Sequence, residues 1–272
     1  MSEITENILD FTKGEGYNII SFPDGEKHLQ LTKAVNKEPL KIVYRFANSD
    51  DVFIFMQLVD ILQRMEVSVS ELYIPYLMTM RCDRVFSLDR PFSLKVLVNV
   101  INLMKADKVI ILEPHSDKCL ELINNSEALM SKVEIDDKKT QICYPDAGAQ
   151  KRYSYKDVCS VDNYFKPIIC KKVRDVNTGN LLKFDIEDKG NYRKGDKIIV
   201  VDDLCDGGGT FLGIHNILKE LEPTSCSLWV THAVQKAGIE KVAAVYDKVY
   251  ITDSYKDWSK EELPENVVVK HI

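Results

Sequence analysis

The sequence lacks several features that would place it in a class at once. No apolar stretch approaches the ~20 residues that a transmembrane helix requires, so we expect no membrane span. The first residues are acidic, with no basic segment followed by an apolar one, so we expect no secretory signal. Basic residues are not in excess. The net charge of −6 argues against a nucleic-acid partner or an anionic membrane surface.

Two kinds of short motif are also missing. The seven cysteines include no CxxC pair, so neither a disulfide framework nor a structural zinc site is expected, and a reducing cytoplasmic location fits. The chain contains no GxxxxGK[ST] loop and no GxGxxG loop. A Walker-type nucleotide site and a dinucleotide-binding site are therefore not expected.

What the sequence does contain is a regular alternation of strand and helix patterns. Strands are expected at 41–47, 72–77, 108–112, 141–144, 197–203, 226–232 and 249–252, and helices at 50–65, 91–106 and 210–223. This alternation predicts an α/β fold with parallel sheets and helices on both faces. A length of 272 residues is enough to bury a full core without metal or disulfide support.

The alternation occurs twice, on either side of a charged stretch at 131–141. We therefore expect two doubly wound parallel-sheet domains, comprising residues 1–139 and 140–272. Residues 171–196 are charged and contain little core-forming material, which predicts a mobile loop or small hairpin before the next strand.

The most informative segment is KIIVVDDLCDGGGTFLGIHNIL (197–218), an apolar run followed by carboxylates, three glycines and an amphipathic helix. Ligands of open parallel sheets bind beyond the carboxyl ends of the strands, and a glycine-rich helix N-terminus suits a phosphate. Adjacent carboxylates can accept hydrogen bonds from a ribose diol, and a threonine hydroxyl can bind a phosphate oxygen. The ribose-phosphate-binding candidates are Asp202, Asp203, Asp206, Gly207, Gly208, Gly209 and Thr210.

This segment resembles the phosphoribosyl-diphosphate motif of type I phosphoribosyltransferases and of ribose-phosphate pyrophosphokinases. Further blocks, in a consistent order, resemble the second family alone: SFPDGEKHLQL, YIPYLMTMRCDRVFSLDRPFSLK, KVIILEPHSDK, ICYPDAGAQKRY and IICKKVRDVNTGNL. The resemblance implies a short, divergent family member with a phosphoribosyltransferase-type fold. Its reaction would move a pyrophosphoryl group from ATP to the C1 hydroxyl of ribose 5-phosphate and release AMP.

The resemblance also implies which residues contact ATP. Phe22 would stack on the base, with Asp24 and Glu26 as hydrogen-bond partners, all reaching from a neighbouring subunit. Arg81 and Asp83 would lie at the ATP phosphates, where a guanidinium can bind in a bidentate way. The partners implied are therefore ATP, a ribosyl phosphate and further copies of the chain in a homo-oligomer. Taken alone, the segment at 21–31 fits an Asp-Gly turn between strands equally well.

The same comparison implies the metal and the catalytic residues. His115 and Asp146 would hold the magnesium ion that bridges the ATP phosphates, since magnesium takes few protein ligands. Lys172 and Arg174 would neutralise charge on the transferring group. Without the resemblance, a single histidine after a strand, such as His115, is more often structural. The PDAG segment alone is typical of a helix start capped by Asp146.

One departure from the family pattern concerns the acceptor. Gly207 stands where the family usually has threonine, which predicts a more open pocket beside the 5-phosphate. Ribose 5-phosphate and a substituted form such as ADP-ribose, whose 1-pyrophosphate could feed NAD salvage, are both candidate acceptors.

Other readings of the chain remain open at this stage. A phosphoribosyltransferase that consumes the 1-pyrophosphate sugar would share only the glycine-rich motif. The second alternative is not an enzyme: it is a non-catalytic homologue that binds nucleotide and regulates a partner enzyme. Replacement of the usual glutamine by Cys82 leaves room for it.

Overall fold

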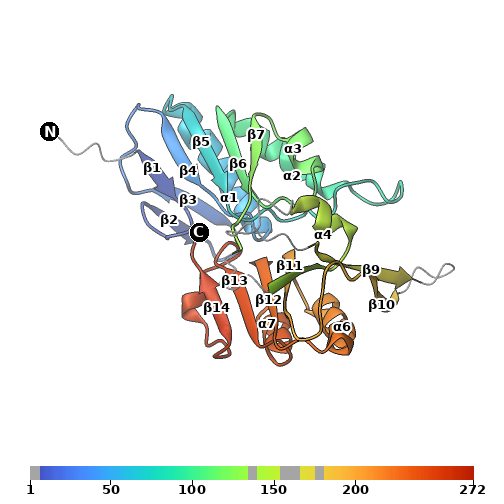
Figure 1. Ribbon diagram of the computed structural model, residues 1–272. Coiled ribbons are helices and arrows are strands. Elements are labelled where there is room, and N and C mark those ends of the chain that lie inside the picture. Colours follow the sequence, from blue (N-terminus) through green and yellow to red (C-terminus); the bar gives the residue numbers. More distant parts are fainter. Residues whose placement is uncertain (1–6, 134–139, 154–165, 175–180) are drawn as a thin grey trace. The chain divides into compact units, whose positions relative to one another are not determined.

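The computed structural model describes residues 7–133, 140–153, 166–174 and 181–272. The chain divides into two compact units, Met1–Leu129 and Met130–Ile272, coloured blue to green and green to red (Figure 1). The domain limits expected from the sequence, 1–139 and 140–272, stay a prediction. The segment 134–139, next to that limit, lies outside the described residues.

Unit 1 (Met1–Leu129) is built on a parallel sheet with the strand order β1-β4-β5-β6-β7. The strands are β1 (Ile8–Asp10), β4 (Leu40–Val43), β5 (Val69–Ile74), β6 (Lys108–Leu112) and β7 (Ser126–Leu129). The helices are α1 (Ser49–Arg64), α2 (Ser93–Ile101) and α3 (Lys118–Leu122), and α2 continues into a 3-10 turn, Asn102–Met104.

Helix α1 begins with a capping box. The Asn48 side chain accepts from the backbone N–H groups of Asp50 and Asp51, and Asp51 accepts in return from the Asn48 N–H at 2.9 Å. Apolar residues at helical spacing, including Phe55 and Leu58, are buried.

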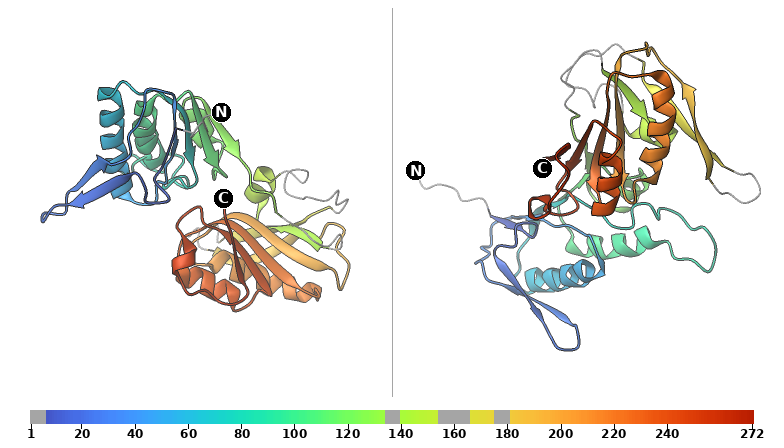
Figure 2. Two further views of the ribbon diagram at one scale, coloured as in Figure 1. Left: turned by 90° about the vertical axis from the view of Figure 1, so that its left-hand side faces the viewer. Right: turned by 90° about the horizontal axis from the view of Figure 1, so that it is seen from below.

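A two-stranded antiparallel hairpin, β2 (Tyr17–Ser21) with β3 (Lys27–Leu31), extends away from the sheet of unit 1 (Figure 2). Gln57 of α1 attaches it, because its amide accepts from the Leu29 N–H at 2.8 Å and donates to the Lys27 carbonyl at 2.7 Å. The turn of the hairpin carries Phe22, Asp24 and Glu26.

Unit 2 (Met130–Ile272) contains a sheet with the strand order β10-β9-β8-β11-β12-β13-β14, in which only β10 is antiparallel to its neighbour. The strands are β8 (Thr140–Tyr144), β9 (Ile168–Arg174), β10 (Leu181–Asp188), β11 (Lys197–Cys205), β12 (Cys226–Ala233), β13 (Lys248–Thr252) and β14 (Val267–Lys270). The helices are α4 (Ala147–Arg152), α6 (Gly209–Leu218) and α7 (Lys236–Ala243), with 3-10 turns at Lys219–Leu221 and Trp258–Lys260.

The central strand β11 is buried on both faces, which is why its sequence is a continuous apolar run. Val200 packs in a cluster with residues of α6 and α7, such as Phe211 and Val242. Its neighbour Val201 packs in the other cluster, with Tyr144 and Trp229. The expected α/β architecture of parallel sheets is therefore confirmed.

The differences from the expected elements lie at their ends. The helix expected at 91–106 ends as α-helix at Ile101, and Lys105 adopts a left-handed conformation with φ 54° after one 3-10 turn. The stretch 171–196, expected to form a mobile loop or a small hairpin, contributes to the antiparallel pair β9–β10, which begins earlier, at Ile168. Its residues 175–180 lie outside the described part. In the portion of the chain that is described, no helix combines the length and apolarity needed to span a membrane.

Candidate functional site

The glycine-rich loop after β11 packs tightly against α7. Gly208 is the N-cap of α6, with φ 79°, and a Cβ there would lie 2.9 Å from the Gly238 carbonyl oxygen. A Cβ on Gly238 would in turn overlap the carbonyl oxygen of Asp206. These two glycines are required by backbone contact. The N-terminal N–H groups of α6, which have no acceptor inside the helix, begin at this loop.

The other two glycines of the loop are under no such constraint. A Cβ on Gly207 or on Gly209 would meet no atom within 4 Å, and both residues are exposed. Asp206 accepts a hydrogen bond of 2.7 Å from the side-chain amide of Gln235. The loop is thus fixed through Gly208 and Asp206 and open at Gly207.

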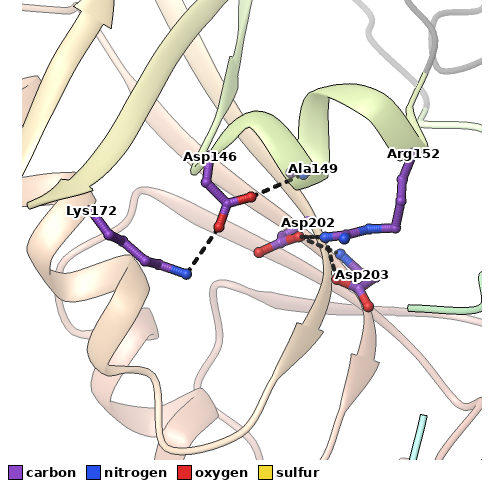
Figure 3. A network of polar contacts seen from close by, with 6 residues as sticks. All are labelled: Asp146, Ala149, Arg152, Lys172, Asp202 and Asp203. Atoms are coloured by element: carbon purple, nitrogen blue, oxygen red, sulfur yellow. Dashed lines mark hydrogen bonds and ion pairs between the residues drawn. The ribbon is translucent and has the colours of Figure 1, made fainter. Parts of the chain in front are cut away.

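The two carboxylates at the end of β11 share one cation. Nη2 of Arg152 lies 2.7 Å from Oδ1 of Asp202 and 2.7 Å from Oδ1 of Asp203 (Figure 3). Both aspartates are buried, at 8% and 1% exposure. Sequence analysis missed Arg152 as a functional residue, although it is the arginine of the block at 142–153.

Burial and mutual repulsion govern the ionisation of this group. Burial, followed by the charge of Asp203, raises the pKa of Asp202 well above its usual value, although Arg152 acts in the opposite direction. Burial lowers the pKa of Arg152, but the charges of Asp203 and Asp202 outweigh it, so that pKa is raised. The guanidinium stays charged and holds the pair together.

Asp146 and Lys172 form a second ion pair in the same unit. Asp146 is the N-cap of α4 and accepts from the Ala149 N–H at 3.0 Å, as its sequence context suggested. Lys172 Nζ on β9 donates to the other carboxylate oxygen, Oδ2, at 3.0 Å (Figure 3). Burial raises the pKa of Asp146, but the Ala149 N–H and the charge of Lys172 outweigh it, so the pKa is lowered.

In unit 1, the segments after β5 and β6 lie side by side. Asp83 accepts from Arg84 Nε at 2.9 Å, and Ser116, the residue after His115, lies close enough to lower the pKa of Asp83. Burial raises the pKa of Asp83, but the effects of Arg84 and Ser116 outweigh it, so the pKa is lowered. The exposed Arg81 belongs to the same segment. The structure therefore brings the Arg81–Asp83 segment next to the His115 segment.

The candidates for the ATP base lie on the tip of the β2–β3 hairpin. Phe22 is 44% exposed, and its ring approaches His28 edge-on, at 6.1 Å between centroids. The Phe22 N–H donates to the Glu26 carbonyl at 2.9 Å, and the Glu26 N–H donates to Asp24 Oδ1 at 3.1 Å. The hairpin thus presents an aromatic ring on a structured turn.

Comparison with known proteins gives a consistent result. No family model matches the chain. The ribose-phosphate pyrophosphokinase of Sulfurisphaera tokodaii is 27% identical over 240 residues, covering 81% of this chain and 80% of that protein. The ribose-phosphate pyrophosphokinase of Pyrococcus abyssi is 26% identical over 245 residues, covering 87% and 83%.

The fold agrees with these sequence relationships. The crystal structure of phosphoribosylpyrophosphate synthetase from Mycobacterium smegmatis superimposes with a TM-score of 0.76 at 16% identity, over 94% of this chain and 85% of that one. This chain is a distant relative of the ribose-phosphate pyrophosphokinases. The resemblance indicated by the motifs, the phosphoribosyltransferase-type fold class and the expectation of a pyrophosphokinase-like enzyme are therefore confirmed.

The residues predicted for the site come from both parts of the sequence, and each is placed only within its own unit. Phe22, Arg81 and His115 belong to unit 1, whereas Asp146 and Asp202 belong to unit 2. The metal pair His115 and Asp146 and the assignment of all site residues stay predictions.

Arg174 is the last residue of β9, and its side chain lies outside the described part. Within that part, no three His, Cys, Asp or Glu side chains form a metal-binding group. The single proposed carboxylate ligand, Asp146, fits magnesium, which usually binds one or two carboxylates together with substrate phosphates and water.

Proposed function

We propose that this chain transfers a pyrophosphoryl group from ATP to the C1 hydroxyl of a ribosyl 5-phosphate and releases AMP. The observation that carries the proposal lies in the last part of β11, where Asp202 and Asp203 share Arg152 shortly before the glycine loop and α6. The printed names of the relatives support the same reaction class.

The acceptor would bind entirely within unit 2. Its 5-phosphate would lie at the N-terminus of α6, where Thr210 offers a hydroxyl and the helix dipole favours negative charge. Its diol would donate hydrogen bonds to the carboxylates of Asp202 and Asp203. These contacts fix the ribose and leave its C1 hydroxyl as the nucleophile, so no protein nucleophile is needed.

Lys172 and Arg174 would act on the group being transferred. Lys172 pairs with Asp146 at 3.0 Å, and its ammonium would turn from that carboxylate to the β-phosphate. In-line attack on the β-phosphorus develops negative charge, which positioned cations stabilise. Magnesium, when bound at His115 and Asp146, would supply further charge neutralisation and orient the ATP phosphates.

ATP would be held by Arg81 and Asp83, with Phe22, Asp24 and Glu26 contributed by a second copy of the chain. The exposed position of Phe22 on the hairpin supports that arrangement, because the ring is available for stacking on a base. A homo-oligomer with shared ATP sites is therefore part of the proposal.

Ribose 5-phosphate and ADP-ribose are both proposed acceptors. The open space beside Gly207 favours including the second, because a substituent on the 5-phosphate needs room at the end of the phosphate loop. In that case the product would be a 1-pyrophosphate of ADP-ribose, a possible precursor for NAD salvage.

The test is product analysis by mass spectrometry with purified protein, ATP and magnesium chloride, and either ribose 5-phosphate or ADP-ribose. We expect AMP and an acceptor heavier by one pyrophosphoryl group, and no product after chelation of the metal. A protein that forms neither with either acceptor would refute the proposal. Consumption of a 1-pyrophosphate sugar without ATP would instead indicate a phosphoribosyltransferase, and nucleotide binding without turnover would indicate the regulatory homologue.

A further inference from the structure

Arg152 contacts the side chains of two successive strand residues, and Oδ1 of Asp202 also accepts from the Asp203 N–H at 3.0 Å. Successive residues of a β-strand point to opposite faces of the sheet. Val200 and Val201, just before the aspartates, follow this rule and pack in different core clusters. Asp202 and Asp203 are the next two residues of β11, yet their Oδ1 atoms both lie 2.7 Å from the same nitrogen of Arg152 (Figure 3).

The position of Arg152 is itself fixed by its surroundings. It is the last residue of α4, whose first turn is capped by Asp146. The next residue, Tyr153, is buried, and its carbonyl accepts from the Tyr144 hydroxyl at 3.1 Å. The guanidinium thus extends from a short helix held at both ends, and 15% of its side chain is exposed.

The electrostatic need for this cation is clear from the burial of its partners. The side chains of Asp202 and Asp203 are 11% and 2% exposed, and two neighbouring carboxylates in such a site repel each other. A charge-assisted bond to each one draws both carboxylates to the same cation. Without Arg152, that attraction would be lost and the repulsion between the two carboxylates would remain.

We propose that Arg152 is a positioning residue for the acceptor. It acts through Asp202 and Asp203, gathering their carboxylates on one side of the strand end so that both can accept from a ribose diol. This inference rests on the proposed function, and it names a residue through which the two carboxylates of the acceptor site are organised.

The experiment compares the wild-type protein with Arg152→Gln and Arg152→Lys in full steady-state kinetics, varying ATP and the acceptor separately. For Arg152→Gln we expect the KM for the acceptor to rise by at least about tenfold, because a buried charged group loses its partner, while the KM for ATP stays within about twofold. Arg152→Lys should be intermediate, since one nitrogen makes both contacts in the native site.

The matched control is Arg64→Gln, which removes an arginine–aspartate pair from the exposed surface of α1. It should leave both KM values unchanged. Circular dichroism and thermal melting establish that each variant is folded, and calorimetric titration with ribose 5-phosphate gives acceptor binding independently of turnover.

Equal increases in the two KM values, or a lysine variant as impaired as the glutamine variant, would overturn the inference. The inference would also be overturned if the Arg152 variants differed from wild type only in melting temperature, with both KM values unchanged. Failure of the proposed function is seen separately, because the wild-type protein would then form no AMP with either acceptor, and the role of Arg152 in that reaction would fall with it.

Discussion

Lys172 Nζ lies 3.0 Å from Oδ2 of Asp146, so the proposed catalytic lysine and the proposed metal ligand are ion-paired across β9 and the start of α4. Both side chains are about one-third exposed, which leaves them accessible to a substrate. The pair would exchange partners when a metal-bound nucleotide arrives, with Lys172 moving to the phosphates and Asp146 to the cation.

Replacing Lys172 by alanine should reduce kcat by a factor of about 10² to 10³, the usual cost of removing one group that stabilises developing charge. The adjacent Lys171→Ala, an exposed position on the same strand, should retain wild-type turnover. AMP release measured by chromatography checks both. Comparable losses in the two variants would show that the effect is not specific to the charge paired with Asp146.

His115→Ala should raise the magnesium concentration needed for half-maximal rate and lower the maximal rate, because a proposed metal ligand is lost. His271→Ala is the control, since that histidine pairs with Asp253 at an exposed position near the C-terminus. A magnesium titration of initial rates provides the measurement. An unchanged magnesium requirement in His115→Ala would remove this residue from the metal site.

Gly207→Thr should fold normally, because a Cβ at this position meets no atom within 4 Å. The added side chain fills the open end of the phosphate loop, so we expect the ratio of kcat/KM for ADP-ribose over ribose 5-phosphate to fall. Competition between the two acceptors, followed by mass spectrometry, gives this ratio directly. If the ratio is unchanged, the space at Gly207 has no part in acceptor choice.

Gly208→Ala should destabilise unit 2 by about 1–2 kcal/mol, because a left-handed backbone is costly for residues with a Cβ. The close approach of the Gly238 carbonyl, 2.9 Å from the added carbon, increases the cost. Gly209→Ala is the matched control, since that position is open and lies in the first turn of α6. Denaturant unfolding of both variants tests the difference, and equal stabilities would contradict it.

The ion pair of Asp83 predicts a defined pH dependence in unit 1. Its pKa is lowered on folding, so its contribution to stability is present above the unfolded pKa, near 4, and is lost as pH falls through the folded value. The stability difference between the wild-type protein and Asp83→Asn should therefore shrink from pH 6 to pH 3.

For this pH series, Asp107→Asn at an exposed site in the same unit is the reference. Urea unfolding at several pH values supplies the measurement. If the difference in unfolding free energy between wild type and Asp83→Asn is independent of pH, the ion pair is not its cause.

The features that the sequence determined are local ones. The buried run of β11, the glycine-rich turn before α6 and the cap at Asp146 each depend on residues within a few positions. Local periodicity and turn chemistry encode such features, and for that reason the α/β class and the position of the phosphate loop could be predicted.

The contacts between distant segments were decided only by the tertiary structure. Arg152 is fifty residues from Asp202 in the chain, and nothing in the strand pattern shows that one guanidinium would collect two side chains expected on opposite faces. The close contact of Gly238 with Asp206 likewise requires α7 to pack on the loop. Such pairings arise from the packing of helices on the sheet. Local sequence patterns do not specify which helix end contacts which strand end.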